Sequence, residues 1–247
     1  MRGDLWPYPT CYYELANSSE KQGGKKMAKE KDRNKLEVVF ILDRSGSMGG
    51  LEADTIGGFN SMLDKQKKEG GDIIWSTVLF DHISEVVHDR VDVDKVSELD
   101  EETYYVRGCT ALLDAVGGAI HHIGNVHKYA REEDRPDKTL FVITTDGMEN
   151  ASVIYDYKKV KQMINRQTER YGWEFIFLGA NIDAAEVAGR MGIRRERAAR
   201  FHNDDVGIAG NFAAMSDVMM EYSFTGAIAD ASLDCIRKDY KSRKKRK

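Results

Sequence analysis

Two carboxylates and three hydroxyls of this chain occur where the sequence predicts loops that follow or precede regular structure. The segment VVFILDRSGSMGG, residues 38–50, carries Asp43, Ser45 and Ser47 at alternate positions directly after an apolar run. Thr110 stands just before a run with helical periodicity, and Asp146 ends a second apolar run, KTLFVITTD. Polar groups at the end of a buried strand must be hydrogen-bonded, be solvated or hold a ligand.

An all-oxygen set of this kind suits a hard divalent cation. Mg²⁺ and Mn²⁺ both accept octahedral oxygen ligands, so the residue types do not separate them. If the hydroxyls contact the metal directly and the carboxylates act mainly through water, the ion keeps much of its positive charge. Such an ion would attract an anionic oxygen. The alternation in DRSGSM aims side chains at one point, and the glycines let the loop turn tightly.

The elements that must position these residues alternate along the chain. Apolar runs predict strands over 36–42, 72–80, 83–93, 138–146, 173–180 and, more weakly, 199–203, and apolar spacing predicts helices over 51–70, 110–130, 153–172, 182–191 and 207–223. Only Asp81 and His82 separate the second and third strands, which predicts an antiparallel hairpin. We therefore expect an α/β fold: a Rossmann-like, doubly wound, mainly parallel sheet with one antiparallel edge strand and helices on both faces. Ligands bind such sheets at the carboxyl ends of the strands.

The set Asp43-x-Ser45-x-Ser47, then Thr110, then Asp146 resembles the metal-ion-dependent adhesion site (MIDAS) of von Willebrand factor type A (VWA) domains. All five positions match in type, order and loop placement, and the similarity covers roughly residues 36–191. The phrases GCTALLDA and TTDGMEN look like those of stand-alone bacterial and phage VWA proteins, including the tellurium-resistance-associated group.

This resemblance implies a metal-dependent protein-binding module. In that family the site binds Mg²⁺ or Mn²⁺, and an acidic side chain of a partner fills the open metal position. By the same resemblance, the hydroxyl ligands would be Ser45, Ser47 and Thr110, and the carboxylates would act directly or through water. We expect Cys109, beside Thr110, to be a buried packing thiol.

The rival interpretation is a Mg²⁺-dependent hydrolase or phosphatase that uses the same strand-end site. A haloacid-dehalogenase-type phosphatase also places an aspartate after its first strand, but it needs a second aspartate two residues later, where this chain has Ser45. Neither a G-x-S-x-G elbow nor a phosphate-binding loop occurs. We therefore expect no enzyme activity and no catalytic residues.

Composition sets the remaining expectations. The 247 residues carry a net charge of −4, but residues 237–247 hold eight Lys or Arg against one Asp, so a basic end follows an acidic body. We expect an unstructured or leader-like extension over 1–35, with Met27 as a candidate native start, a single VWA domain over 36–236 and a basic disordered tail. The tail suggests at most weak, non-specific contact with nucleic acid. No apolar run is long enough to cross a membrane, and a secretory signal is missing, so we expect a cytoplasmic protein.

Overall fold

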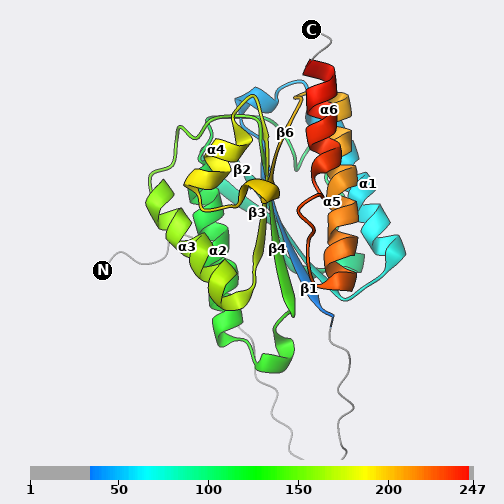
Figure 1. The fold of residues 1–247 in the computed structure, drawn as a ribbon, viewed down its shortest axis with the longest axis vertical. Helices are drawn as coiled ribbons and strands as arrows, with labels where there is room; N and C mark the ends of the chain where they lie inside the picture. The colour runs from blue at the N-terminus through cyan, green and yellow to red at the C-terminus, as the bar shows by residue number, and fades with distance from the viewer. Residues whose placement is uncertain (1–33, 245–247) are drawn as a thin grey trace, which may run out of the picture. The chain divides into compact units, whose positions relative to one another are not determined.

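A computed structural model describes residues 34–244 and shows six strands in one sheet (Figure 1). The strand order is β3-β2-β1-β4-β5-β6, with β3 antiparallel to β2 and all other neighbours parallel. The strands are β1 (Leu36–Asp43), β2 (Ile73–Phe80), β3 (Ser84–Asp92), β4 (Lys138–Thr145), β5 (Glu174–Ala180) and β6 (Ala198–Phe201). The expected mainly parallel sheet with one antiparallel edge strand is confirmed.

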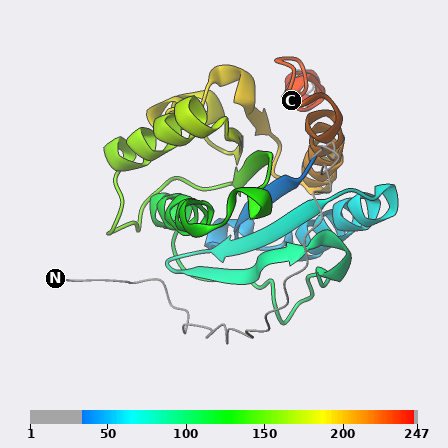
Figure 2. The same cartoon turned by 90° about the horizontal axis from the view of Figure 1, so that it is seen from below.

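Helices cover both faces of this sheet, as Figures 1 and 2 show. One face carries α2 (Leu112–Tyr129), α3 (Tyr157–Tyr171) and α4 (Ala184–Arg190), and the other carries α1 (Glu52–Glu69), α5 (Asp205–Thr225) and α6 (Asp234–Lys244). Alternate residues of β1 enter the two cores: Phe40 and Leu42 pack with α1 and α5, whereas Ile41 packs with α2. Because β1 is buried on both faces, its sequence is almost continuously apolar.

The carboxyl-terminal end of the described chain differs from the expectation. Residues 237–244 belong to α6 instead of a disordered tail. The reason is that basic side chains find partners: a guanidinium nitrogen of Arg237 lies 2.8 Å from the carbonyl oxygen of Glu196, and Arg243 forms a 2.7 Å ion pair with Asp204. Tyr240 also stacks on His202. Residues 1–33, which include Met27, and residues 245–247 lie outside the described residues, so the predictions made for them stay predictions.

Within residues 34–244, no helix has the length and apolarity that spanning a membrane requires.

Candidate metal centre

The five residues singled out in the sequence come together at the carboxyl edge of the two central strands. Asp43 ends β1 and Asp146 directly follows β4, the parallel neighbour of β1. Ser45 and Ser47 lie in the loop and 3₁₀ turn that follow β1. The Ser47 hydroxyl donates a hydrogen bond to a carboxylate oxygen of Asp146, and the Ser45 and Ser47 hydroxyl oxygens are 3.2 Å apart.

Gly147 shows that Thr110 belongs to the same group. A Cβ placed on Gly147 would lie 3.1 Å from the Ser47 hydroxyl oxygen and 3.1 Å from that of Thr110. The two hydroxyls therefore flank one small space that only a glycine leaves open. The loop before α2 thus joins the loops after β1 and β4 at one point.

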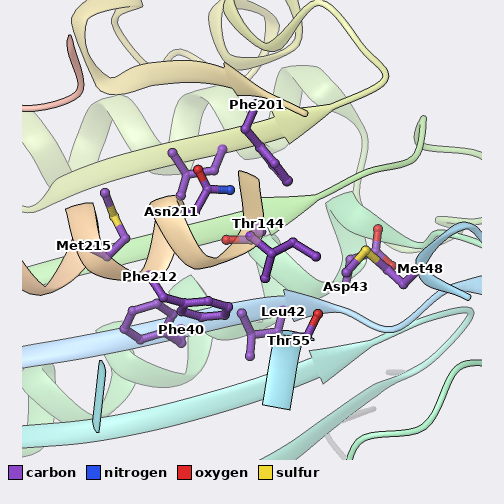
Figure 3. Close-up of a pocket in the computed structure, with 12 residues that line it drawn as sticks. Phe40, Leu42, Asp43, Met48, Thr55, Thr144, Phe201, Asn211, Phe212 and Met215 are labelled. Atoms are coloured by element: carbon purple, nitrogen blue, oxygen red, sulfur yellow. The ribbon is translucent and has the colours of Figure 1, made fainter. Parts of the chain in front are cut away.

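Asp43 is almost fully enclosed, with 2% of its surface exposed. It lies at one end of a pocket whose other lining is mostly apolar, including Phe40, Leu42 and Phe212 (Figure 3). Loss of hydration raises the pKa of Asp43 to about 6, even though hydrogen bonds from the Ser45 side chain, the Thr145 hydroxyl at 2.5 Å and the Ser45 N–H at 2.7 Å favour the charged form. The negative charge of Asp146 raises the pKa further.

Asp146 is in a similar position. Burial raises its pKa, and hydrogen bonds from the Ser47 hydroxyl and the Asn203 side chain oppose that rise. Asn203 donates from its amide nitrogen to the second Asp146 oxygen at 2.8 Å, while its own amide oxygen is buried without a partner among the described residues. Two nearby buried carboxylates with raised pKa values carry a charge that a cation would stabilise.

Sequence reasoning did not find Asn203 or Thr145. Asn203 lies between β6 and α5, 57 residues from Asp146, and no motif marks it. Thr145 could have been considered, because it directly precedes Asp146 and the pattern already placed that strand end at the site.

A buried ion-pair network supports the loop after β1. Arg44 is fully buried and its Nε lies 3.0 Å from an Asp81 carboxylate oxygen, which Arg107 Nε also contacts at 2.7 Å. Burial alone would raise the pKa of Asp81, but the hydrogen bonds from Arg107 and Arg44 hold it below its usual value. The Arg107 N–H donates to the Arg44 carbonyl at 2.9 Å, so the network fixes the loop before α2 against the loop after β1.

The segment after β4 is hydrogen-bonded to the start of α2. The Asn150 side-chain oxygen accepts from the Thr110 N–H at 2.9 Å, and the Glu149 carboxylate accepts from the Leu113 N–H at 2.8 Å. The Asp114 carboxylate accepts in return from the Tyr155 N–H at 2.8 Å. The phrases GCTALLDA and TTDGMEN therefore form one hydrogen-bonded unit that holds Thr110 and Asp146 in place.

The donor set fits a hard divalent cation better than zinc. It consists of two carboxylates and three hydroxyls, whereas structural zinc sites use mostly His and Cys. Residues 34–244 contain no group of three or more His, Cys, Asp or Glu that could hold a metal ion. Cys109 does not join the set: it is exposed, contrary to the expected buried thiol, because the loop before α2 lies at the surface and buries Thr110 instead.

Comparisons with known proteins agree on the fold. No protein-family model matches the sequence, and no curated protein matches it. The von Willebrand factor domain of the type V pili tip protein Mfa5 from Porphyromonas gingivalis superposes with a TM-score of 0.54 at 10% identity, over 79% of this chain and 98% of that domain. The PilB minor pilin from Streptococcus sanguinis gives 0.52 at 10% identity and covers 81% of this chain. This chain spans only 64% of PilB. At such identity the likeness shows a shared fold.

Proposed function

We propose that this chain, which has the VWA fold, is a metal-ion-dependent protein-binding module whose bound Mg²⁺ or Mn²⁺ captures an acidic side chain of a partner. The observation that carries the proposal is the convergence of Asp43 and Asp146, both buried and both with a raised pKa, on three hydroxyls at the carboxyl edge of the sheet. Two enclosed carboxylates that form no ion pair with any residue of 34–244 are costly unless a cation compensates them.

Within the proposed site, Ser45, Ser47 and Thr110 provide hydroxyl ligands, and Asp43 and Asp146 act directly or through water. The bound ion would supply an electrophilic position for a carboxylate of the partner. The protein's own contribution is rigidity: the Ser45 N–H and the Thr145 hydroxyl orient the Asp43 carboxylate, and Asn203 orients that of Asp146.

Exposed apolar side chains at the same end of the sheet support a protein partner. Among the described residues nine large apolar side chains are exposed. Five of them lie in loops beyond the carboxyl ends of strands, and a sixth lies in the first turn of α5, which follows β6: Ile83, Tyr105, Met148, Val153, Ile154 and, on α5, Val206. Met148, 72% exposed, is two residues after Asp146. Exposed apolar surface next to a polar centre is typical of interaction sites.

The acidic body of the chain fits this proposal. Its general field repels an anionic partner, so a cation must supply the attraction locally. We further propose that the protein acts in the cytoplasm and that it is of the bacterial or phage type. We also propose that its VWA domain begins at residue 36 and extends past the expected end at residue 236, because α6 continues to residue 244.

A Mg²⁺-dependent phosphatase remains the second candidate, because Asp43 ends β1 as the nucleophile of such enzymes does. Ser45 occupies the position at which those enzymes need an acid-base aspartate, and a hydroxyl cannot replace a carboxylate in that role. Assays with phosphate and ester substrates in Mg²⁺ test this candidate. Turnover that Asp43→Asn abolishes would favour the enzyme over the binding module.

Peptide selection tests the binding proposal without a known partner. The full chain is immobilised in Mg²⁺, displayed random peptides are bound, and bound peptides are released with EDTA. We expect the recovered peptides to share an Asp, a Glu or a terminal carboxylate, and the Asp43→Ala/Asp146→Ala variant to recover none of them. Asp217→Ala, which removes a 69% exposed carboxylate on α5, is the matched control and should bind them normally. Peptides that bind equally well in EDTA would contradict the proposal.

A further inference from the structure

A second candidate site lies between α2 and α3, near the end of the sheet opposite the metal centre. The two helices lie side by side on one face of the sheet (Figure 1). They bound a groove of about 580 Å³, within the roughly 300–1,000 Å³ range of small-molecule sites. Its floor includes Thr139 near the start of β4 and Trp173 just before β5, which are the amino ends of these parallel strands.

Facing helix surfaces are usually apolar, but this groove is walled by polar side chains. From α2 it takes His121, Gly124, Asn125 and Lys128, whose spacing puts them on one helix face. From α3 it takes Arg166 and Gln167 with Met163. The apolar residues of α2, such as Ile123, pack on the sheet instead. The polar residues of α2 that line the groove are therefore on a different face of the helix from the residues that pack on the sheet.

The charge of the groove is positive, in a chain whose net charge is −4. Its Lys and Arg residues are Lys128, Arg135 and Arg166, and its one acidic residue is Asp137. Arg135 is held at the edge of the groove by the Ala130 carbonyl, 3.1 and 3.2 Å from two guanidinium nitrogens. Arg166, by contrast, is exposed and makes no ion pair or hydrogen bond with any other residue in the described part of the chain.

The floor of the groove offers further hydrogen-bond donors. Trp173 and Thr139 are 3% and 2% exposed. Neither the indole N–H nor the hydroxyl donates to another residue within 34–244, although the indole ring itself packs against Phe141 and His127. Neither atom is among the buried polar atoms of residues 34–244 that lack a partner, so both donors reach solvent in the groove, where a ligand rich in acceptor oxygens can replace water.

We propose that this groove binds an organic phosphate of about nucleotide size. Guanidinium groups match phosphate oxygens in charge and geometry, which favours a phosphate over a neutral ligand. Three apolar residues, Ile120, Met163 and Pro136, lie among the polar lining of the groove and suit the organic part of the ligand, which inorganic phosphate lacks. The site is separate from the metal centre and does not depend on the proposed function.

Titration calorimetry on the full-length protein tests the proposal. The probes are AMP, ADP, ATP, ribose 5-phosphate and inorganic phosphate, in EDTA and at near-physiological salt, so that neither the metal centre nor weak surface attraction contributes. We expect at least one organic phosphate to bind at least about tenfold more tightly than inorganic phosphate. Arg166→Glu should weaken that binding by about tenfold or more, the equivalent of losing one charge-assisted hydrogen bond.

Arg170→Glu is the matched control. It makes the same change of charge one turn further along α3, at a residue that does not line the groove. It should leave binding nearly unchanged. Asn125→Trp, which places a large side chain in the groove, should block binding without a change of charge. The proposal is overturned if no organic phosphate binds, if inorganic phosphate binds equally well, or if Arg170→Glu weakens binding as much as Arg166→Glu. Binding of an oligoglutamate peptide, but of no phosphate, would also overturn it.

Discussion

Replacing Asp43 by Asn should stabilise the metal-free protein at neutral and alkaline pH. The side chain is 2% exposed, and its burial raises the carboxyl pKa from the ordinary 3.8 to about 6. The carboxyl has a higher pKa in the folded state than in the unfolded state. Above about pH 6 its negative charge therefore destabilises the folded state, whereas below about pH 4 the group is protonated in both states and has no such effect. At about 1.36 kcal/mol per pH unit, this difference corresponds to about 3 kcal/mol in the free energy of unfolding.

An asparagine can keep the local hydrogen bonds. Its amide oxygen can accept from the Ser45 N–H, and its amide nitrogen can donate to Thr145 Oγ1, which in turn can donate to the Gly147 carbonyl at 3.2 Å. We therefore expect Asp43→Asn in EDTA to raise the free energy of unfolding by about 1–3 kcal/mol at pH 8 and by almost nothing at pH 4. The same variant should lose the stabilisation that Mg²⁺ gives the wild type.

Urea denaturation in EDTA, at several pH values, measures the effect. In the wild type, added Mg²⁺ should stabilise at pH 8 and progressively less as the pH falls through 6, because protons then compete for Asp43. A variant that is destabilised by the same amount at every pH would refute the reasoning, since it would show that the Asp43 charge is not costly in the folded state.

Three further substitutions test the supporting structure. Gly147→Ala places a Cβ 3.1 Å from the Ser47 and Thr110 hydroxyls and should weaken Mg²⁺ binding in calorimetry. Gly189→Ala, with open space around its Cβ, should not weaken it. Equal affinities of the two variants would contradict a metal site between the Ser47 and Thr110 hydroxyls. Arg44→Met removes a fully buried partner of Asp81 and should lower the free energy of unfolding by about 3–5 kcal/mol in urea denaturation. Arg131→Met, which removes an exposed ion pair with Asp134, should have little effect, and similar losses for the two variants would contradict the network. Arg237→Ala removes hydrogen bonds from α6 to the Glu196 and Ala198 carbonyls and should lower stability by about 1–3 kcal/mol, while the exposed Lys238→Ala should be neutral.

The sequence was sufficient to predict the sheet and the meeting of the five candidate ligands. Apolar runs marked the strands, and the rule that parallel strands end at one edge brought Asp43 and Asp146 together. The residues that hydrogen-bond to the candidate ligands, or that support their loops, could not be predicted by such rules. Asn203 reaches Asp146 across 57 residues and Arg44 reaches Asp81 across 37, and only the folded chain shows which polar residue lies opposite which.

Helix α6 shows a different limit of sequence reasoning. Its composition is strongly basic, which is typical of a solvated tail, but the contacts that order it come from Asp204 and from backbone carbonyls near β6. Backbone acceptors have no signature in the sequence. The groove between α2 and α3 could not be predicted from the sequence for a related reason. Its basic residues come from two helices and a loop, and no local sequence pattern connects them.

Binding of Mn²⁺ followed by electron paramagnetic resonance tests the central claim, a divalent-cation site made by the five residues, most directly. The signal of free Mn²⁺ should fall as the full-length protein is added, with one ion bound per chain, and Mg²⁺ should displace it. Asp43→Ala/Asp146→Ala should bind none, and Asp217→Ala should bind as the wild type does. A wild type that leaves the free Mn²⁺ signal unchanged, or a double variant that still binds one ion, would contradict the account.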